Sequence, residues 1–157
     1  MIKEIKPPHF LPHADCDLSI FLAGTIEMGK SEDWQFDAVQ VINSVYGDER
    51  NLKMNIYNPR RDNFNPDWKQ EFEDPHFSQQ VNWELDALEK ATFIVFNFLP
   101  ESRSPITLHE LGLFARSGKC WVCCPKEFWR SGNVEITCNR FNIPLYRNME
   151  ELLNELL

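Results

Sequence analysis

Short, largely apolar runs alternate along this chain with segments whose apolar residues recur at intervals of three and four. The first pattern predicts strands buried on both faces of a sheet, and the second predicts amphipathic helices. Strands are expected at residues 18–23, 54–57, 92–98, 119–124 and 143–146. Helices are expected at residues 34–45, 77–91, 105–118, within 128–141 and at 149–157. This regular alternation predicts an α/β fold, with one domain over residues 1–157 and a five-stranded parallel sheet covered by helices on both faces.

The segment 60–75 interrupts this alternation. It is polar and rich in Asn and Asp, which predicts a long surface loop with a helical turn. Loops of this length are uncommon in compact domains and often cover a binding site. Arg60 and Arg61 open the segment. They can bind a phosphate or pair with acidic side chains, and pairing is the simpler expectation.

The junction between the third strand and its helix carries the most informative polar residues. Ser104 suits the N-cap of a helix and Pro105 suits its first position. A helix that follows a buried parallel strand begins at the carboxyl edge of the sheet, where open α/β folds bind ligands. Glu110 lies near this helix start, so the helix dipole is expected to favour its ionised form. An ionised carboxylate is either a nucleophile toward a sugar carbon or only a surface charge near the dipole.

A second carboxylate, Glu84, lies on the preceding helix. The early residues of that helix are nearer the carboxyl edge, so Glu84 can face Glu110 across a pocket as an acid/base partner. Two carboxylates at short range repel each other, which raises one of the two pKa values. A purely structural role for Glu84 is equally compatible with the residues. Asp86 most simply pairs with Lys90 four residues later, and it is also kept as a candidate substrate contact.

The loop after the first strand reads Gly24-Thr25-Ile26-Glu27-Met28-Gly29. Its glycines let the backbone approach a ligand. The loop lacks the GxGxxG spacing and the Walker lysine, so neither a dinucleotide site nor a P-loop is supported. Glu27 would oppose a phosphate and suits sugar hydroxyls better. Gly24, Thr25 and Glu27 are therefore candidate substrate contacts, although an ordinary tight turn explains the loop equally well.

The charge balance limits the classes of partner. With 24 acidic and 16 basic residues the net charge is −8, which argues against a nucleic acid polymer or an anionic membrane as partner. No apolar run approaches the roughly 20 residues of a membrane span. Residues 1–17 carry charges and prolines where a secretion signal would be apolar. A soluble, cytoplasmic protein is expected.

The cysteines fit a reducing compartment, because there are five of them and three lie in one strand-like run. Cys120 and Cys123 form a CxxC motif, but no second CxxC or HxxxH exists to complete a zinc site. Both are interpreted as small apolar side chains of a buried strand. No metal site is expected.

These segments together resemble the nucleoside 2-deoxyribosyltransferase superfamily, including its nucleoside monophosphate N-glycosidase branch. The resemblance covers residues 18–29, 83–98, 104–115 and 132–134, and its most specific part is Glu110-Leu111-Gly112 after a strand and a loop. It implies a flavodoxin-like or Rossmann-like fold. It also implies that Glu110 attacks C1′ of the sugar and expels the base, which gives a covalent glycosyl-enzyme, as in retaining glycosidases. The sugar then passes to another base or to water, and no cofactor is needed.

The resemblance also suggests roles for other residues. Glu84 stands where the family usually has Asp, and would protonate the departing base or orient Glu110. Ser104 would meet the 5′ end of the sugar, and serine at this position is typical of the monophosphate hydrolases. Glu27 departs from those hydrolases, which place a basic residue in the first loop. Asn133 resembles an asparagine that transferases contribute across a subunit interface, which implies a homodimer or higher homo-oligomer.

Transfer of the sugar from a nucleoside to a free base is therefore the first expectation. Hydrolysis of a (deoxy)nucleoside or of its 5′-monophosphate is the second. A nucleotide-binding sensor module without turnover is the third, because a fold does not dictate a function.

Overall fold

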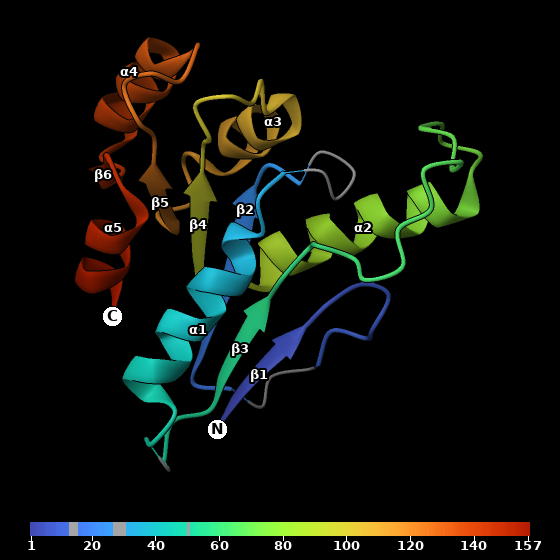
Figure 1. The fold of residues 1–157 in the computed structure, drawn as a ribbon, viewed down its shortest axis with the longest axis horizontal. Helices are drawn as coiled ribbons and strands as arrows, with labels where there is room; N and C mark the ends of the chain where they lie inside the picture. Colours follow the sequence, from blue (N-terminus) through green and yellow to red (C-terminus); the bar gives the residue numbers. More distant parts are fainter. Residues whose placement is uncertain (13–15, 27–30, 50) are drawn as a thin grey trace.

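The strands and helices of the computed structural model alternate as the sequence predicts (Figure 1). The structure describes residues 1–12, 16–26, 31–49 and 51–157. In chain order the elements are β1 (Ile2–Ile5), β2 (Leu18–Gly24), α1 (Trp34–Tyr46), β3 (Met54–Tyr57), α2 (Pro75–Lys90), β4 (Phe93–Asn97), α3 (Pro105–Phe114), β5 (Cys120–Cys123), α4 (Ser131–Phe141), β6 (Leu145–Tyr146) and α5 (Met149–Leu156). Within the described ranges, no helix has both the length and the apolar character to cross a membrane.

The strands form one parallel sheet in the order β1-β3-β2-β4-β5-β6. The predicted α/β class is confirmed, but the described sheet has six strands instead of five. The additional strand, β1, pairs only with β3 at the edge of the sheet. Its apolar residues Ile2 and Ile5 are separated by two charged residues, so they lack the alternation that predicts a strand. An edge strand tolerates such charged side chains.

The order of the other strands determines where a ligand can bind. From β2 to β6 they follow the spatial order 2-1-3-4-5, which is the order of flavodoxin-like folds. The chain places β3 on one side of β2 and then β4 on the other side. Such a reversal opens a crevice beyond the carboxyl ends of the two central strands. The arrowheads of β2 and β4 in Figure 1 point to this edge, where α3 begins.

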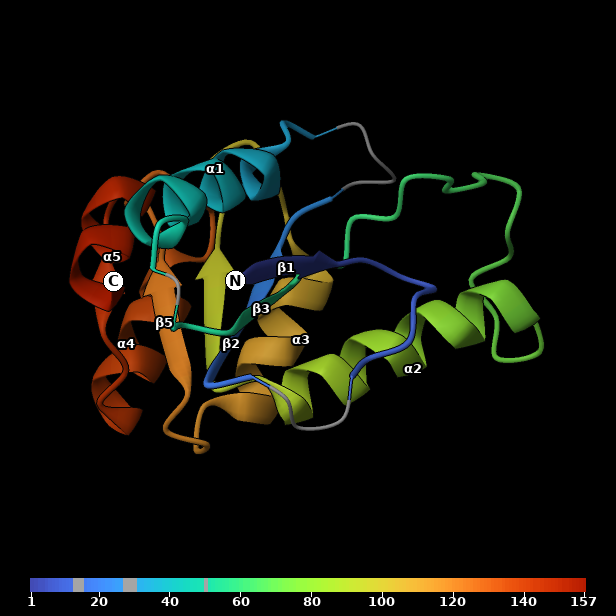
Figure 2. The same cartoon turned by 90° about the horizontal axis from the view of Figure 1, so that it is seen from below.

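The sheet separates two apolar layers, and α1 and α5 cover one face while α2, α3 and α4 cover the other (Figure 2). Alternation along β2 supplies both layers. Phe21 and Ala23 pack toward α2 and α3, whereas Ile20 and Leu22 pack toward α1 and α5. All four side chains are fully buried, as expected for a central parallel strand.

The CxxC motif follows the same alternation. Cys120 lies in the layer of α2, α3 and α4, and Cys123 lies in the opposite layer. Residues three apart on a strand point to opposite faces, so these two thiols cannot share a metal ion. Burial raises the pKa of Cys123 to about 12. The interpretation as packed apolar side chains therefore agrees with the structure.

Several element ends differ from the sequence prediction. α2 begins at Pro75, two residues early, because the Asp74 side chain accepts hydrogen bonds from the backbone amides of His76 and Phe77. The helical turn predicted in the long loop is wrong: residues 60–74 contain turns and bends only. α3 ends at Phe114, four residues before Gly118. Of the predicted last strand, only Leu145–Tyr146 pairs with β5.

Replacing Gly24 with Ala is expected to lower the free energy of unfolding by about 1–3 kcal/mol through overpacking. An added Cβ would lie 2.6 Å from Trp34 Cζ2 and 2.8 Å from the backbone oxygen of Asn97. Gly112 in α3 is the matched control, because an added Cβ there meets nothing within 4 Å. Gly112→Ala should stabilise the helix by about 0.5–1 kcal/mol. Denaturant unfolding measures both changes, and equal stability of the two variants would contradict the close approach of Trp34 to β2.

Candidate functional site

Three buried hydroxyl groups meet where β2 and β4 end. Thr25 Oγ1 donates a hydrogen bond to Ser102 Oγ at 2.9 Å and also contacts Ser104 Oγ. Ser102 Oγ lies 3.0 Å from Ser104 Oγ and accepts a hydrogen bond from the Ser104 amide at 3.1 Å. The sequence predicted Thr25 and Ser104 as site residues, and the structure brings them together. Ser102 was missed, although a polar residue in the loop before a candidate helix start is a usable signal.

Ser104 occupies the N-cap position of α3 as predicted, but its side chain does not cap the helix. Its hydroxyl is instead engaged with Thr25 and Ser102. The backbone of Ser104 is left-handed, with φ 46° and ψ 50°, a conformation that costs a non-glycine residue on the order of 1–3 kcal/mol. The first amides of α3 therefore receive no hydrogen bond from the Ser104 side chain and face the carboxyl edge of the sheet.

Glu110 lies on the buried face of α3 with Thr107 and Leu111. It is 7% exposed, and its pKa is raised to about 8, first by burial and second by the charge of Glu84. The sequence-based expectation considered only the helix dipole, whereas burial favours the neutral form of Glu110. Glu110 is in the second turn of α3, whereas the dipole acts mainly within the first turn. Burial outweighs it.

Glu84 approaches Glu110 from α2, and its charge contributes to the raised pKa of Glu110. Burial raises the pKa of Glu84 itself to about 7. One hydrogen bond opposes this effect: Gln80 Nε2 donates to Glu84 Oε1 at 2.7 Å and favours the ionised form. Gln80 Nε2 also donates to the Pro59 oxygen at 3.0 Å, so the amide is held in place. Sequence reasoning missed Gln80, although it lies four residues before Glu84 on the same helix face.

The two carboxylates have the properties of an acid/base pair. With pKa values raised to about 7 and about 8, the pair keeps a proton near neutral pH and can also release it there. Two further buried polar residues lie at this edge and were not predicted: Asn97 at the end of β4 and Thr107 one turn before Glu110. Each has a signal in the sequence. Asn97 is a polar residue at the end of an apolar strand, and Thr107 lies three positions before Glu110.

The remaining predicted residues have different positions. Gly24 ends β2 directly beside Thr25. Glu27 lies outside the described residues. Asp86 is exposed on α2. In the described part of the chain it forms no ion pair with Lys90, although the sequence predicted one. Asn133 is exposed on α4 and lines a groove of about 330 Å³ between α3 and α4, together with Leu108 and Gly112. This groove lies on the other flank of α3 from Glu84.

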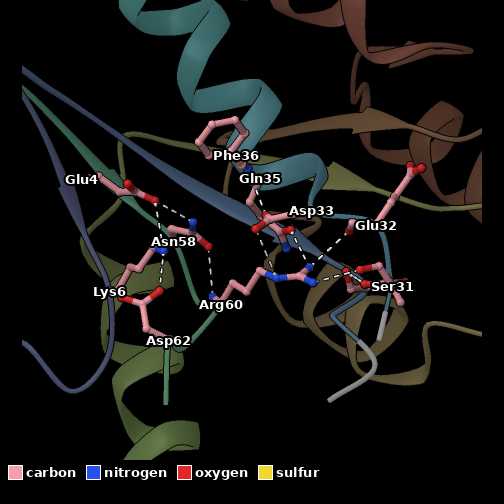
Figure 3. A network of polar contacts seen from close by, with 11 residues as sticks. Glu4, Lys6, Ser31, Glu32, Asp33, Gln35, Phe36, Asn58, Arg60 and Asp62 are labelled. Carbon is pink, nitrogen blue, oxygen red and sulfur yellow. Dashed lines mark hydrogen bonds and ion pairs between the residues drawn. The ribbon is translucent and has the colours of Figure 1, made fainter. Parts of the chain in front are cut away.

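Of the two arginines after β3, Arg60 pairs with an acidic side chain as predicted, whereas Arg61 contacts neutral residues. Arg60 Nε lies 3.4 Å from Asp33 Oδ2 (Figure 3). Arg61 donates hydrogen bonds to Asn63 and Gln79 and places its guanidinium 4.7 Å from the centre of the Trp68 ring. In the part of the chain that the structure describes, no group of three His, Cys, Asp or Glu side chains could hold a metal ion.

Replacing Glu110 with Gln is expected to raise the melting temperature at pH 8.5 and to leave it nearly unchanged at pH 4. Burial raises the folded-state pKa from 4.5 to about 8. The stability that the neutral acid contributes is therefore complete below about pH 4.5 and is lost as the pH rises through about 8. Gln stays neutral, so a gain of several °C follows above pH 8. The control is Glu89→Gln, an exposed carboxylate on α2. A thermal scan in which Glu110→Gln gains nothing at pH 8.5 would contradict the burial argument.

Comparison with known proteins identifies the family and supports the fold. A family model described as nucleoside 2-deoxyribosyltransferase-like matches residues 17–128. A crystal structure of a conserved protein from Enterococcus faecalis V583 has a similar fold, with a TM-score of 0.61 and 14% sequence identity over 88% of this chain and 96% of that chain. No curated protein matches the chain significantly. Because the family match spans well over half of the 157 residues, the chain belongs to the nucleoside 2-deoxyribosyltransferase-like family.

Proposed function

We propose that this protein cleaves the N-glycosidic bond of a (deoxy)nucleoside through Glu110 and transfers the sugar to a second base. The observation that carries the proposal is the interaction of the buried Glu110 with the partly buried Glu84, both with raised pKa values. The family supports a nucleoside as the substrate class. The hydroxyls of Thr25 and Ser104 beside this edge suit the polar groups of a sugar.

The chemistry divides into two steps. A carboxylate oxygen of Glu110 forms a bond to C1′ while the bond between C1′ and the base nitrogen breaks, and the electron pair leaves with the base. Glu84 gives its proton to the departing base. In the second step a nitrogen of the incoming base attacks C1′, the bond to Glu110 breaks and the carboxylate is restored. Glu84 takes up the proton that the incoming base releases.

We propose substrate contacts for several of the residues predicted from the sequence, including Glu27, which lies outside the described residues. Thr25 and Ser104 would meet the sugar, with Ser104 at its 5′ end, and the Gly24 backbone would contact the ligand beside Thr25. Glu27 would contact the sugar from the same loop. Asn133 is exposed on α4, and we propose that it serves the site of a neighbouring subunit in a homo-oligomer.

One observation favours a second candidate, hydrolysis of a nucleoside 5′-monophosphate. Ser104 does not cap α3, so the first amides of this helix remain directed at the carboxyl edge beside the Ser102 and Ser104 hydroxyls. A helix N-terminus with nearby hydroxyls stabilises a phosphate group. In this alternative water replaces the incoming base in the second step.

Incubation with thymidine and adenine, followed by chromatography, is expected to give deoxyadenosine. Glu110→Gln should lower kcat/KM by at least about 1,000-fold, because the nucleophile is lost. Glu89→Gln, an exposed carboxylate on α2, should retain full activity. Free thymine without deoxyadenosine would show hydrolysis, and thymine released only from thymidine monophosphate would show the second candidate. Full turnover by Glu110→Gln would refute the mechanism, and no product from any substrate would favour a binding module.

The pH profile of kcat/KM is expected to be bell-shaped, with limbs near pH 7 and pH 8. The two limbs belong to the coupled pair, because only the singly protonated pair can hold an ionised Glu110 together with a protonated Glu84. In Glu84→Gln the proton donor and the repelling charge are both removed. The alkaline limb should therefore disappear, and the remaining acid limb should report Glu110 alone, with its pKa lowered from about 8 by the loss of the Glu84 charge. Initial rates between pH 5 and pH 10 measure both effects, and an unchanged profile in Glu84→Gln would exclude the coupled pair.

A further inference from the structure

Arg60 connects the end of β3 to the segment that leads into α1. Its Nη2 donates to the Ser31 oxygen at 2.8 Å and its Nη1 donates to the Glu32 oxygen at 3.1 Å. Its Nε lies 3.4 Å from Asp33 Oδ2. Figure 3 shows the guanidinium pointing at these three consecutive residues. The rigid fork of an arginine can serve three acceptors at once, which the single ammonium of a lysine cannot do in the same geometry.

Arg60 is itself held in place by Asn58, which is 1% exposed. Asn58 Oδ1 accepts a hydrogen bond from the Arg60 amide at 2.9 Å, and Asn58 Nδ2 donates to Glu4 Oε1 at 2.7 Å. The Asn58 amide donates to the Ile5 oxygen at 3.0 Å. The edge strand β1 thereby fixes the residue that orients Arg60 (Figure 3).

Ser31 continues this set of contacts toward the site. Its hydroxyl donates to the backbone oxygen of Thr25 at 3.1 Å, and its amide donates to the Ile26 oxygen at 3.4 Å. The Thr25 hydroxyl in turn contacts Ser102 and Ser104 at the start of α3. A continuous path of hydrogen bonds therefore runs from Arg60 to the helix that carries Glu110.

We propose that Arg60 is a positioning residue for the reaction: by fixing residues 31–33 it holds Thr25 against Ser102 and Ser104, where the sugar binds. This inference rests on the proposed function. Arg60 acts through Ser31 and Thr25, and it does not contact the acid/base pair. Loss of Arg60 therefore weakens substrate binding more than the chemical step.

The kinetic test compares Arg60→Lys with Arg61→Lys. In the described structure Arg61 contacts Asn63, Gln79 and Trp68, which lie on its own loop and on α2. For Arg60→Lys we expect KM to rise about tenfold while kcat stays within about threefold of the wild type. Arg61→Lys should leave KM unchanged. Ser31→Ala, which removes the next hydrogen bond of the path, should raise KM in the same way.

A double-mutant cycle tests whether Arg60 acts through Thr25. Thr25→Val with Arg60→Lys should be no worse than Thr25→Val alone, because residues that act as one unit are not additive. Fully additive losses, or an Arg60→Lys enzyme that matches Arg61→Lys, would overturn the proposal.

Amide hydrogen exchange provides a readout that does not depend on turnover. Exchange across residues 31–37 should be faster in Arg60→Lys than in Arg61→Lys, because the carbonyl contacts and the Asp33 pairing are lost. Equal rates of amide exchange in the two variants would overturn the positioning role of Arg60, whatever the enzymatic activity of either variant. Faster exchange in a protein that cleaves no nucleoside supports the role of Arg60 in holding the loop and refutes only the proposed reaction.

Discussion

The candidate site depends on the electrostatic interaction of two carboxylates, the partly buried Glu84 on α2 and the buried Glu110 on α3. Burial raises both pKa values, and the charge of Glu84 raises that of Glu110 further. A folded protein gains no stability from such an arrangement when both groups are ionised. It persists because the surrounding framework fixes both helices, and perturbed groups of this kind are concentrated at functional sites.

That framework depends on contacts between segments far apart in sequence. The parallel sheet brings the ends of β2 and β4 side by side, and the hydroxyls of Thr25, Ser102 and Ser104 join the loops that follow them. Gly24 leaves room for Trp34 against the same strand end. Arg60 secures the first of these loops from β3. Each loop at this edge is therefore held by a neighbour from another strand, which keeps polar groups in defined positions.

The central strands and their order along the chain were predictable, because strands buried on both faces need unbroken apolar runs. The location of Glu110 at the carboxyl edge followed from the same pattern. The predictions that failed depended on local rules alone. Ser104 has the residue type of an N-cap, but its hydroxyl contacts Thr25, directly after β2, and Ser102 in the loop before α3. The dipole argument for Glu110 ignored burial, which a single helix does not reveal.

The sequence by itself determined the α/β class, the strand–helix alternation and the residue types that carry the chemistry, because these depend on periodicity and on short motifs. The tertiary structure decided that β1 joins the sheet, that Gln80 donates a hydrogen bond to Glu84, and that Arg60 contacts residues 31–33. These features depend on distances between segments separated by tens of residues. Such distances are set by how the helices pack on the sheet, and no local pattern encodes them.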